Sequence, residues 1–187
     1  MSISALEDKE IIFGYGSNLS RDLLRARLND GSWHETEWIK LGNPVGPDPI
    51  DLGIARLAGY SFKYNLQDLE KPLEGFTTGN IVEDPNGHVF GAVYQITPDQ
   101  LRLLDKDEDE GSSYKRTALA VQIVASSILE VGSTLSAYCY VGLPDQVVPD
   151  HRINPDPEYV ENLIAFGQER GLSDLYINTH FKTLSHN

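Results

Sequence analysis

The clustering of β-rich segments constrains the fold of this chain more than any other feature of its sequence. Runs typical of strands, rich in aromatic and β-branched residues, occupy 11–13, 55–64, 80–82, 89–96, 114–125 and 136–141. Apolar residues at helical spacing occupy 21–28 and 157–170, and a short capped helix is predicted at 100–104. Because strands and helices do not alternate regularly, the sequence predicts an α+β fold: a strongly curved or closed mixed β-barrel-like sheet flanked by helices.

Turn signals predict how neighbouring strands connect. Asp84-Pro85-Asn86-Gly87 separates two strand segments, which favours a β-hairpin at this point. Gly132 stands between segments 114–125 and 136–141, so we expect these two strands to pair in antiparallel fashion. Segment 42–53, with three prolines and three glycines, and the polar segment 65–79 are predicted to be loops.

Length and charge bound the kind of protein. A chain of 187 residues suits one domain spanning 1–187, which can bury a core without metal or disulfide cross-links. The 15 Lys and Arg against 28 Asp and Glu give a formal charge of −13, which repels phosphate backbones and anionic lipids. We therefore expect no nucleic acid and no membrane among its partners. The single cysteine, Cys139, cannot form an internal disulfide, and residues 1–10 lack a secretory signal, so the sequence favours a cytoplasmic location.

A glycine-rich loop from Gly14 to Leu19 joins a short apolar strand to a helix for which Ser20 is the predicted N-cap. Gly14 and Gly16 permit a sharp turn, and converging backbone N–H groups beside a helix N-terminus could receive a substrate carboxylate or a developing oxyanion. An ordinary strand-to-helix turn explains the same residues. Dinucleotide-binding, phosphate-loop and serine-hydrolase motifs are excluded, because the glycines or the Gly-Lys-Ser/Thr sequence that they require are missing.

Five carboxylates crowd the segment Asp105-Lys106-Asp107-Glu108-Asp109-Glu110. A solvated surface tolerates such mutual repulsion most easily. A calcium-binding loop fits the alternating aspartates but fails at its sixth position, Glu110, and at its twelfth, Arg116. The third interpretation is catalytic: one carboxylate, partly desolvated near the glycine-rich loop, exchanges a proton with a substrate.

Two motifs, taken together and in this order, are similar to those of a known family. Tyr15-Gly16-Ser17-Asn18-Leu19 follows an apolar strand, and Leu104-Asp105-Lys106-Asp107-Glu108 precedes Tyr114. The chain thereby resembles the γ-glutamylcyclotransferase-like family, which includes AIG2-like proteins, over most of its length. The family pattern around the catalytic acid is Leu-Asp-x-x-Glu-Gly with a tyrosine shortly after it. Glu108 fits this spacing, but Asp109 replaces the glycine, and the pair Glu110-Gly111 makes Glu110 a competing acid.

The resemblance implies a reaction in which the free α-amine of a γ-glutamyl compound attacks its own γ-carbonyl. The products are 5-oxoproline and an amine or amino acid, the partner is a small-molecule γ-glutamyl substrate, and no metal or organic cofactor is required. Glu108 would be the catalytic general base and then the general acid. The resemblance also implies a set of substrate-binding residues: Tyr15, Gly16, Ser17, Asn18, Leu19, Tyr114 and Tyr140.

Neighbouring residues and other activities complete the predictions. Tyr138 shares the strand face of Tyr140 and could take part, whereas Cys139 points the other way and is predicted to be a buried small hydrophobe. One alternative function is an enzyme of the same fold that removes a γ-glutamyl protecting group in a biosynthetic pathway. Another is a small-molecule binding or regulatory protein without turnover, which the extra carboxylate of Asp109 beside Glu108 would favour.

Overall fold

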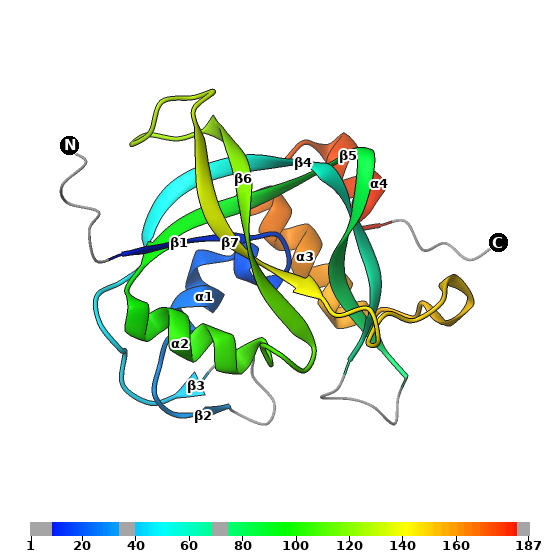
Figure 1. Cartoon of the computed structure of the whole chain (residues 1–187), viewed down its shortest axis with the longest axis horizontal. Helices are drawn as coiled ribbons and strands as arrows, with labels where there is room; N and C mark the ends of the chain where they lie inside the picture. Colours follow the sequence, from blue (N-terminus) through cyan, green and yellow to red (C-terminus); the bar gives the residue numbers. More distant parts are fainter. Residues whose placement is uncertain (1–8, 34–39, 69–74, 183–187) are drawn as a thin grey trace.

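The structure, a computed structural model, describes residues 9–33, 40–68 and 75–182. Five strands form a closed barrel in the order β1-β5-β4-β6-β7 (Figure 1). Their bounds are β1 (Glu10–Gly14), β4 (Ile50–Gln67), β5 (Thr77–Ile96), β6 (Tyr114–Ala125) and β7 (Thr134–Gly142). Strand β1 pairs antiparallel with β5 and parallel with β7, so the sheet is mixed and closes on itself. The predicted α+β fold with a closed, mixed, barrel-like sheet is confirmed.

The hairpin predicted at 84–87 is wrong. Strand β5 continues past these residues, because β4 supplies backbone partners on both sides of them: Ala58 for His88 and Tyr60 for Glu83. The turn residues therefore form a bulge within one long two-stranded ribbon. By contrast, β6 and β7 pair in antiparallel register from Tyr114 to Gln122, as predicted.

Both segments that were predicted to be loops are partly strand. Strand β4 begins at Ile50 and ends at Gln67, and β5 begins at Thr77, so the ribbon takes residues from each predicted loop. A separate two-stranded sheet, β2 (Ser32–Trp33) with β3 (Lys40–Leu41), lies beside the barrel. The loop prediction failed because alternation of apolar residues is weak at the ends of these strands, although Leu52 and Leu66 are buried there.

Helices α1 and α2 each contribute residues to the cavity that the loop after β1 also lines. Helix α1 (Arg21–Arg27) begins as predicted at Ser20, whose Oγ accepts a hydrogen bond from Leu23 N at 3.3 Å. Helix α2 (Pro98–Asp107) begins with a capping box between Thr97 and Gln100. It extends beyond the predicted 100–104, and Glu108 is its C-cap. The acidic run therefore belongs to the end of a helix and the turn after it.

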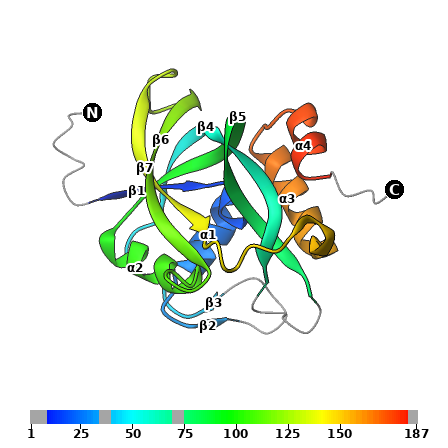
Figure 2. The ribbon, with the colours of Figure 1, turned by 45° about the vertical axis from the view of Figure 1, so that its right-hand side comes forward.

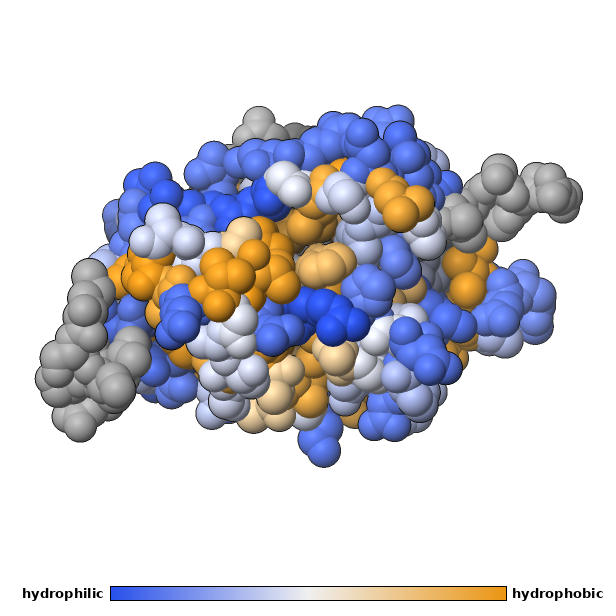
Figure 3. Space-filling view, turned by 90° about the horizontal axis from the view of Figure 1, so that it is seen from above, coloured by the Kyte–Doolittle hydropathy of each residue, from blue (hydrophilic) through white to orange (hydrophobic). Residues whose placement is uncertain are grey.

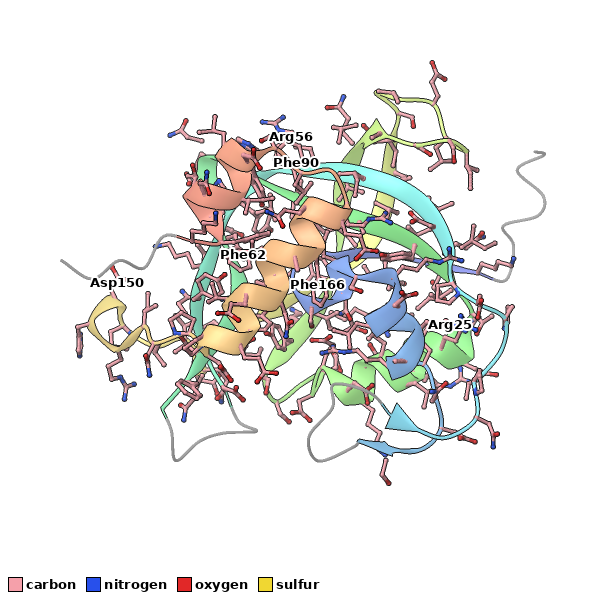
Figure 4. All side chains as sticks on the ribbon, turned by 180° about the vertical axis from the view of Figure 1, so that it is seen from behind. Arg25, Arg56, Phe62, Phe90, Asp150 and Phe166 are labelled. Carbon is pink, nitrogen blue, oxygen red and sulfur yellow. The ribbon has the colours of Figure 1, made fainter. Side chains whose placement is uncertain are left out.

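The C-terminal helices cover the outer side of the β4–β5 ribbon (Figure 2). Helix α3 (Pro157–Glu169) follows its N-cap Asp156, and α4 (Asp174–His180) is a further helix in a segment for which no structure was predicted. Seen from behind, α3 runs diagonally past Phe62 of the ribbon (Figure 4). The Phe62 ring makes edge contacts with Tyr64 at 4.9 Å and Phe181 at 5.3 Å between centroids. Phe181 is the C-cap of α4, so its contact with Phe62 holds this helix against the barrel.

The surface of the molecule mixes polar and apolar side chains. Figure 3 shows a band of hydrophobic residues between polar margins on the face seen from above. The large hydrophobic side chains that are exposed come from separate places along the chain: Ile50, Ile128, Val131, Val147 and Leu175. Among the described residues, none of the helices has the length and hydrophobicity needed to span a membrane.

Candidate active site

A cavity opens where the loop after β1 meets the end of α2. Its wall brings together residues that lie far apart in the sequence, from β1, α1, β5, α2, β7 and α3. The predicted site residues that line it are Tyr15, Gly16, Ser17, Asn18, Glu108, Tyr114 and Tyr140. Leu19 does not line it: its side chain is fully buried in the core, and its carbonyl accepts a hydrogen bond from Tyr94 OH at 2.9 Å. Leu19 therefore anchors the loop from outside the cavity.

The loop holds its shape through close backbone contacts. A Cβ atom on Gly14 would lie 2.4 Å from the carbonyl oxygen of Asn18, so only glycine fits at the end of β1. A short 3-10 helix, η2 (Ser17–Leu19), follows and leads directly into α1. Tyr15 OH donates to the carbonyl of Tyr140 at 2.6 Å, which ties the loop to β7. The side chain of Asn18 is buried and faces the acidic end of α2.

Glu108 sits at this meeting point with almost no contact to solvent. Its Oε1 accepts hydrogen bonds from Arg27 Nη1 and from Asn18 Nδ2, both at 2.7 Å. Only 12% of the Glu108 side chain and 10% of the Arg27 side chain are exposed, so the ion pair is largely desolvated. Such a pair is stable when hydrogen bonds accompany the charge, as they do here.

The other carboxylates of the acidic run have different surroundings. Asp105 pairs with Arg116 and accepts a hydrogen bond from Tyr140 OH at 2.8 Å. Asp107 lines the cavity beside Glu108, whereas Glu110 is exposed and does not line it. Of the two acids that competed on sequence spacing, only Glu108 faces the cavity and the glycine-rich loop.

The backbone conformation at Asp109 explains why aspartate can replace the glycine of the family pattern. It has φ of 46°, the only positive φ of a residue other than glycine in the described ranges. Glycine adopts this left-handed conformation at no steric cost, which accounts for a glycine at this position in the pattern. Aspartate is one of the few other residues that tolerates it. The backbone path after Glu108 is therefore kept, and the Asp109 side chain is exposed at the rim of the cavity.

Tyrosine hydroxyls cover much of the cavity wall. Tyr114 OH donates to the carbonyl of Gly79 at 2.8 Å. Tyr159, on α3, places its hydroxyl against Gly16 and Gly79, where added Cβ atoms would lie 3.0 and 2.7 Å from it. Burial raises the pKa of Tyr15, Tyr114 and Tyr159, and the negative charge of Glu108 adds to the shift. The three hydroxyls therefore stay protonated at neutral pH and can donate hydrogen bonds.

Two further predictions concern β7. Tyr138 does not line the cavity: its ring lies under the guanidinium of Arg116, 4.8 Å from the centroid. Cys139 is fully buried, as predicted, and burial raises the pKa of its thiol, which opposes a role as nucleophile. Throughout 9–33, 40–68 and 75–182, no three His, Cys, Asp or Glu side chains are grouped so that they could hold a metal ion.

Arg27 and Tyr159 are among the cavity residues that sequence reasoning did not assign to the site. Arg27 follows Leu23 by four positions and Leu24 by three, so it lies on the apolar face of α1. An arginine on a buried helical face signals a buried acidic partner, and this signal was available in the sequence. Tyr159 also lies on a buried helical face, where nothing distinguishes it from a core aromatic residue.

Comparisons with known proteins give one family match and several structural neighbours. A family model described as Gamma-glutamyl cyclotransferase, AIG2-like, matches residues 12–161, while a comparison with curated proteins gives no match. A solved structure described as Gamma-glutamyl cyclotransferase aligns with a TM-score of 0.68 at 18% identity, covering 96% of this chain and 90% of that chain. An uncharacterized Homo sapiens protein aligns with a TM-score of 0.66 at 20% identity and the same coverage. A yeast γ-glutamyl cyclotransferase specific to glutathione aligns at 0.57 and 11%, covering 96% and 100%. These structures share the fold of this chain.

Proposed function

This chain belongs to the γ-glutamyl cyclotransferase, AIG2-like family, and we propose that it cyclises a γ-glutamyl amide to 5-oxoproline and releases the amine. The observation that carries the proposal is the position of Glu108, a carboxylate in a cavity formed by the glycine-rich loop and buried tyrosines. Glu108 is the catalytic acid and base in this proposal. The residues that contact substrate are Tyr15, Gly16, Ser17, Asn18, Tyr114 and Tyr140, with Tyr159 added from the structure.

Two protons must leave the α-ammonium nitrogen, because it carries three hydrogens and the lactam nitrogen of 5-oxoproline carries one. Glu108 takes the first proton, and the amine nitrogen attacks the γ-carbonyl carbon to form a tetrahedral intermediate whose ring nitrogen still carries two hydrogens. Glu108 gives its proton to the leaving nitrogen as the bond from the carbon to that nitrogen breaks. The restored carboxylate then takes the second proton from the ring nitrogen and passes it to the released amine, which becomes an ammonium ion. Because nucleophile and carbonyl belong to one molecule, the protein contributes mainly orientation and charge stabilisation. No metal or organic cofactor takes part in the proposed reaction.

The surroundings of Glu108 suit this chemistry. The Tyr159 hydroxyl also belongs to the cavity wall, and because it stays protonated it could donate a hydrogen bond to the oxyanion of the intermediate. The loop from Gly14 to Asn18 forms the adjoining wall and could hold the glutamyl portion through backbone groups.

The alternative without turnover loses its main support. It depended on Asp109 as an extra carboxylate beside Glu108, but Asp109 is exposed at the rim and keeps the left-handed backbone of the family pattern. We therefore favour an active enzyme. A cytoplasmic location, and one domain over 1–187, remain predictions from the sequence.

The test is the identity of the products. Purified protein, treated with a chelator, is incubated in ¹⁸O-water with γ-glutamyl amines, γ-glutamyl dipeptides and glutathione, and the products are analysed by mass spectrometry. The proposal predicts 5-oxoproline without ¹⁸O from at least one substrate. Glutamate carrying ¹⁸O would show a hydrolase instead. No release of amine from the whole panel by folded protein would contradict the proposed reaction.

A further inference from the structure

The two carboxylate oxygens of Glu108 have different surroundings. Oε1 accepts two hydrogen bonds of 2.7 Å, from Arg27 Nη1 and Asn18 Nδ2. Oε2 accepts none from the part of the chain that the structure describes. A carboxylate can rotate readily about its last torsion, since that torsion has broad preferences. Two charge-assisted donors on one oxygen remove this freedom.

The two donors also hold each other. Arg27 Nη1 donates to Asn18 Oδ1 at 3.3 Å, so the amide of Asn18 presents its oxygen to Arg27 and its nitrogen to Glu108. The three side chains form a closed ring of hydrogen bonds. They come from three different elements: the end of α1, the 3-10 helix η2 and the C-cap of α2. The ring therefore sets where the end of α2 stands relative to the loop.

From this geometry we propose that Arg27 and the side chain of Asn18 are positioning residues that hold Oε1 and leave Oε2 as the oxygen that exchanges the proton. This inference rests on the proposed function, since it names the working oxygen of the same acid. Oε2 takes the proton from the α-ammonium of the substrate and returns it to the departing nitrogen. Arg27 and the Asn18 side chain act through Glu108, while the Asn18 backbone stays in the substrate-binding loop.

The energetic reason lies in the precision that proton transfer requires. A misplacement of about 1 Å in a reacting group can cost about 10²-fold in rate. Without the ring of hydrogen bonds, the Glu108 carboxylate could rotate, and Oε2 would no longer be held where it accepts the proton. The substrate would still bind, because the tyrosines and the loop backbone that line the cavity remain in place.

Three variants of α1 test the inference. Arg27→Gln removes the charge, Arg27→Lys keeps it, and Arg25→Gln is the matched control, because Arg25 pairs with Asp48 on the exposed side of the same helix (Figure 4). We expect Arg27→Gln to lower kcat about 10²-fold with less than about a threefold change in KM. Arg27→Lys should recover part of this loss, and Arg25→Gln should stay within about twofold of wild type. Thermal unfolding of each variant verifies that it is folded.

Coupling between the two donors gives an independent measurement. If Arg27 and Asn18 act as one unit, Asn18→Ala combined with Arg27→Gln should cost no more in kcat than the more damaging single change. Additive losses would overturn the inference. A raised KM with unchanged kcat in Arg27→Gln would also overturn it, because that result assigns Arg27 to substrate binding.

Crystal structures separate this inference from the proposed function. The Glu108 carboxylate should turn away from its wild-type position in Arg27→Gln and keep it in Arg25→Gln. If the wild-type protein releases no 5-oxoproline from any substrate, the proposed function fails. These structures then remain as the test of whether Arg27 and Asn18 position the Glu108 carboxylate. An unmoved Glu108 in Arg27→Gln would then overturn the positioning role.

Discussion

Two arginine–carboxylate pairs of this molecule differ in how many of the two carboxylate oxygens accept hydrogen bonds. Arg170, at the end of α3, reaches Asp51 on β4 and contacts both of its oxygens, one of them at 2.8 Å. Gly53 N also donates to Asp51 Oδ1 at 2.9 Å. Glu108 is more deeply buried than Asp51, with 12% against 27% of the side chain exposed, yet its two hydrogen bonds both fall on one oxygen.

The difference separates a structural pair from one that faces a cavity. Both oxygens of Asp51 accept hydrogen bonds, and the pair with Arg170 ties α3 to the barrel. Asp51 does not line the cavity. Glu108 lies on the cavity wall, and both of its hydrogen bonds fall on Oε1. Burial and ion pairing alone do not mark a functional acid, because both pairs have them. The two pairs differ in that Glu108 lines the cavity and has one carboxylate oxygen without a hydrogen bond from the described residues.

The largest expected effect on stability comes from breaking the pair of Asp51 with Arg170. Asp51→Asn leaves Arg170 as a partly buried charge without its counterion, which should cost about 3–5 kcal/mol in the free energy of unfolding. Turnover of the folded protein should not change. Urea unfolding with a parallel 5-oxoproline assay measures both, and Asp48→Asn, at an exposed pair, is the control with an expected loss below about 1 kcal/mol. A loss of turnover would remove the distinction between the two pairs.

The next effect comes from the loop that supplies one donor to Glu108. Gly14→Ala places a Cβ 2.4 Å from the backbone oxygen of Asn18, which cannot give way as a flexible side chain could. We expect a loss of about 1–3 kcal/mol in unfolding free energy from overpacking. Unlike Asp51→Asn, this change should also lower kcat, because it displaces Asn18 from Glu108. Normal kcat in Gly14→Ala would show that the position of Asn18 is unimportant.

A smaller effect, of opposite sign, is expected beside the catalytic acid. Asp109→Gly relieves the left-handed strain of a side chain at φ 46° but adds flexibility to the unfolded chain. The net change should be a stabilisation of about 0–1 kcal/mol, with turnover retained. Melting temperature and kcat measure the two parts. Lower stability in Asp109→Gly would mean that the Asp109 side chain makes a contribution beyond its backbone conformation.

Acid pH gives the smallest effect and tests the pair of Asp51 with Arg170 again. Burial opposes ionisation of Asp51, but hydrogen bonds from Arg170 and Gly53 outweigh it and lower its pKa below the usual 3.8. A lowered carboxyl pKa means that the unfolded chain binds the proton more readily, so the stabilisation exists above the usual pKa and is lost as pH falls below it. As the pH falls from about 5 to below the usual carboxyl pKa, wild type should therefore lose more unfolding free energy than Asp51→Asn. Parallel acid unfolding curves would contradict this.

The sequence predicted the loop better than the acid because the loop depends on local contacts. Gly14, Gly16 and the Ser20 cap act within a few residues of each other, and the structure places the loop beside the cavity. The choice between Glu108 and Glu110 depends on where α2 ends, and the predicted helix stopped at residue 104 while the real one continues to Asp107. Helix ends are hard to predict, since one more turn costs little free energy.

Contacts between distant segments account for the other failures. The turn signal at 84–87 is genuine, but β4 pairs with β5 on both sides of it and overrides the predicted hairpin. Arg27 and Glu108 are 81 positions apart, so only the folded chain brings them together. Tyr159 reaches the cavity from a helix whose pattern indicates simple core packing.

The most direct test of the central claim compares Glu108→Gln with Glu110→Gln in the release of 5-oxoproline from one substrate. Glutamine keeps the shape of glutamate and can still accept the hydrogen bond from Arg27, but an amide cannot act as a base at neutral pH. Because Glu108→Gln also leaves Arg27 without its counterion, thermal unfolding must verify that the variant is folded. The account predicts that Glu108→Gln lowers kcat by about 10²–10⁴-fold. Glu110→Gln should retain wild-type turnover, because Glu110 is exposed and outside the cavity. Full activity in Glu108→Gln together with its loss in Glu110→Gln would contradict the account.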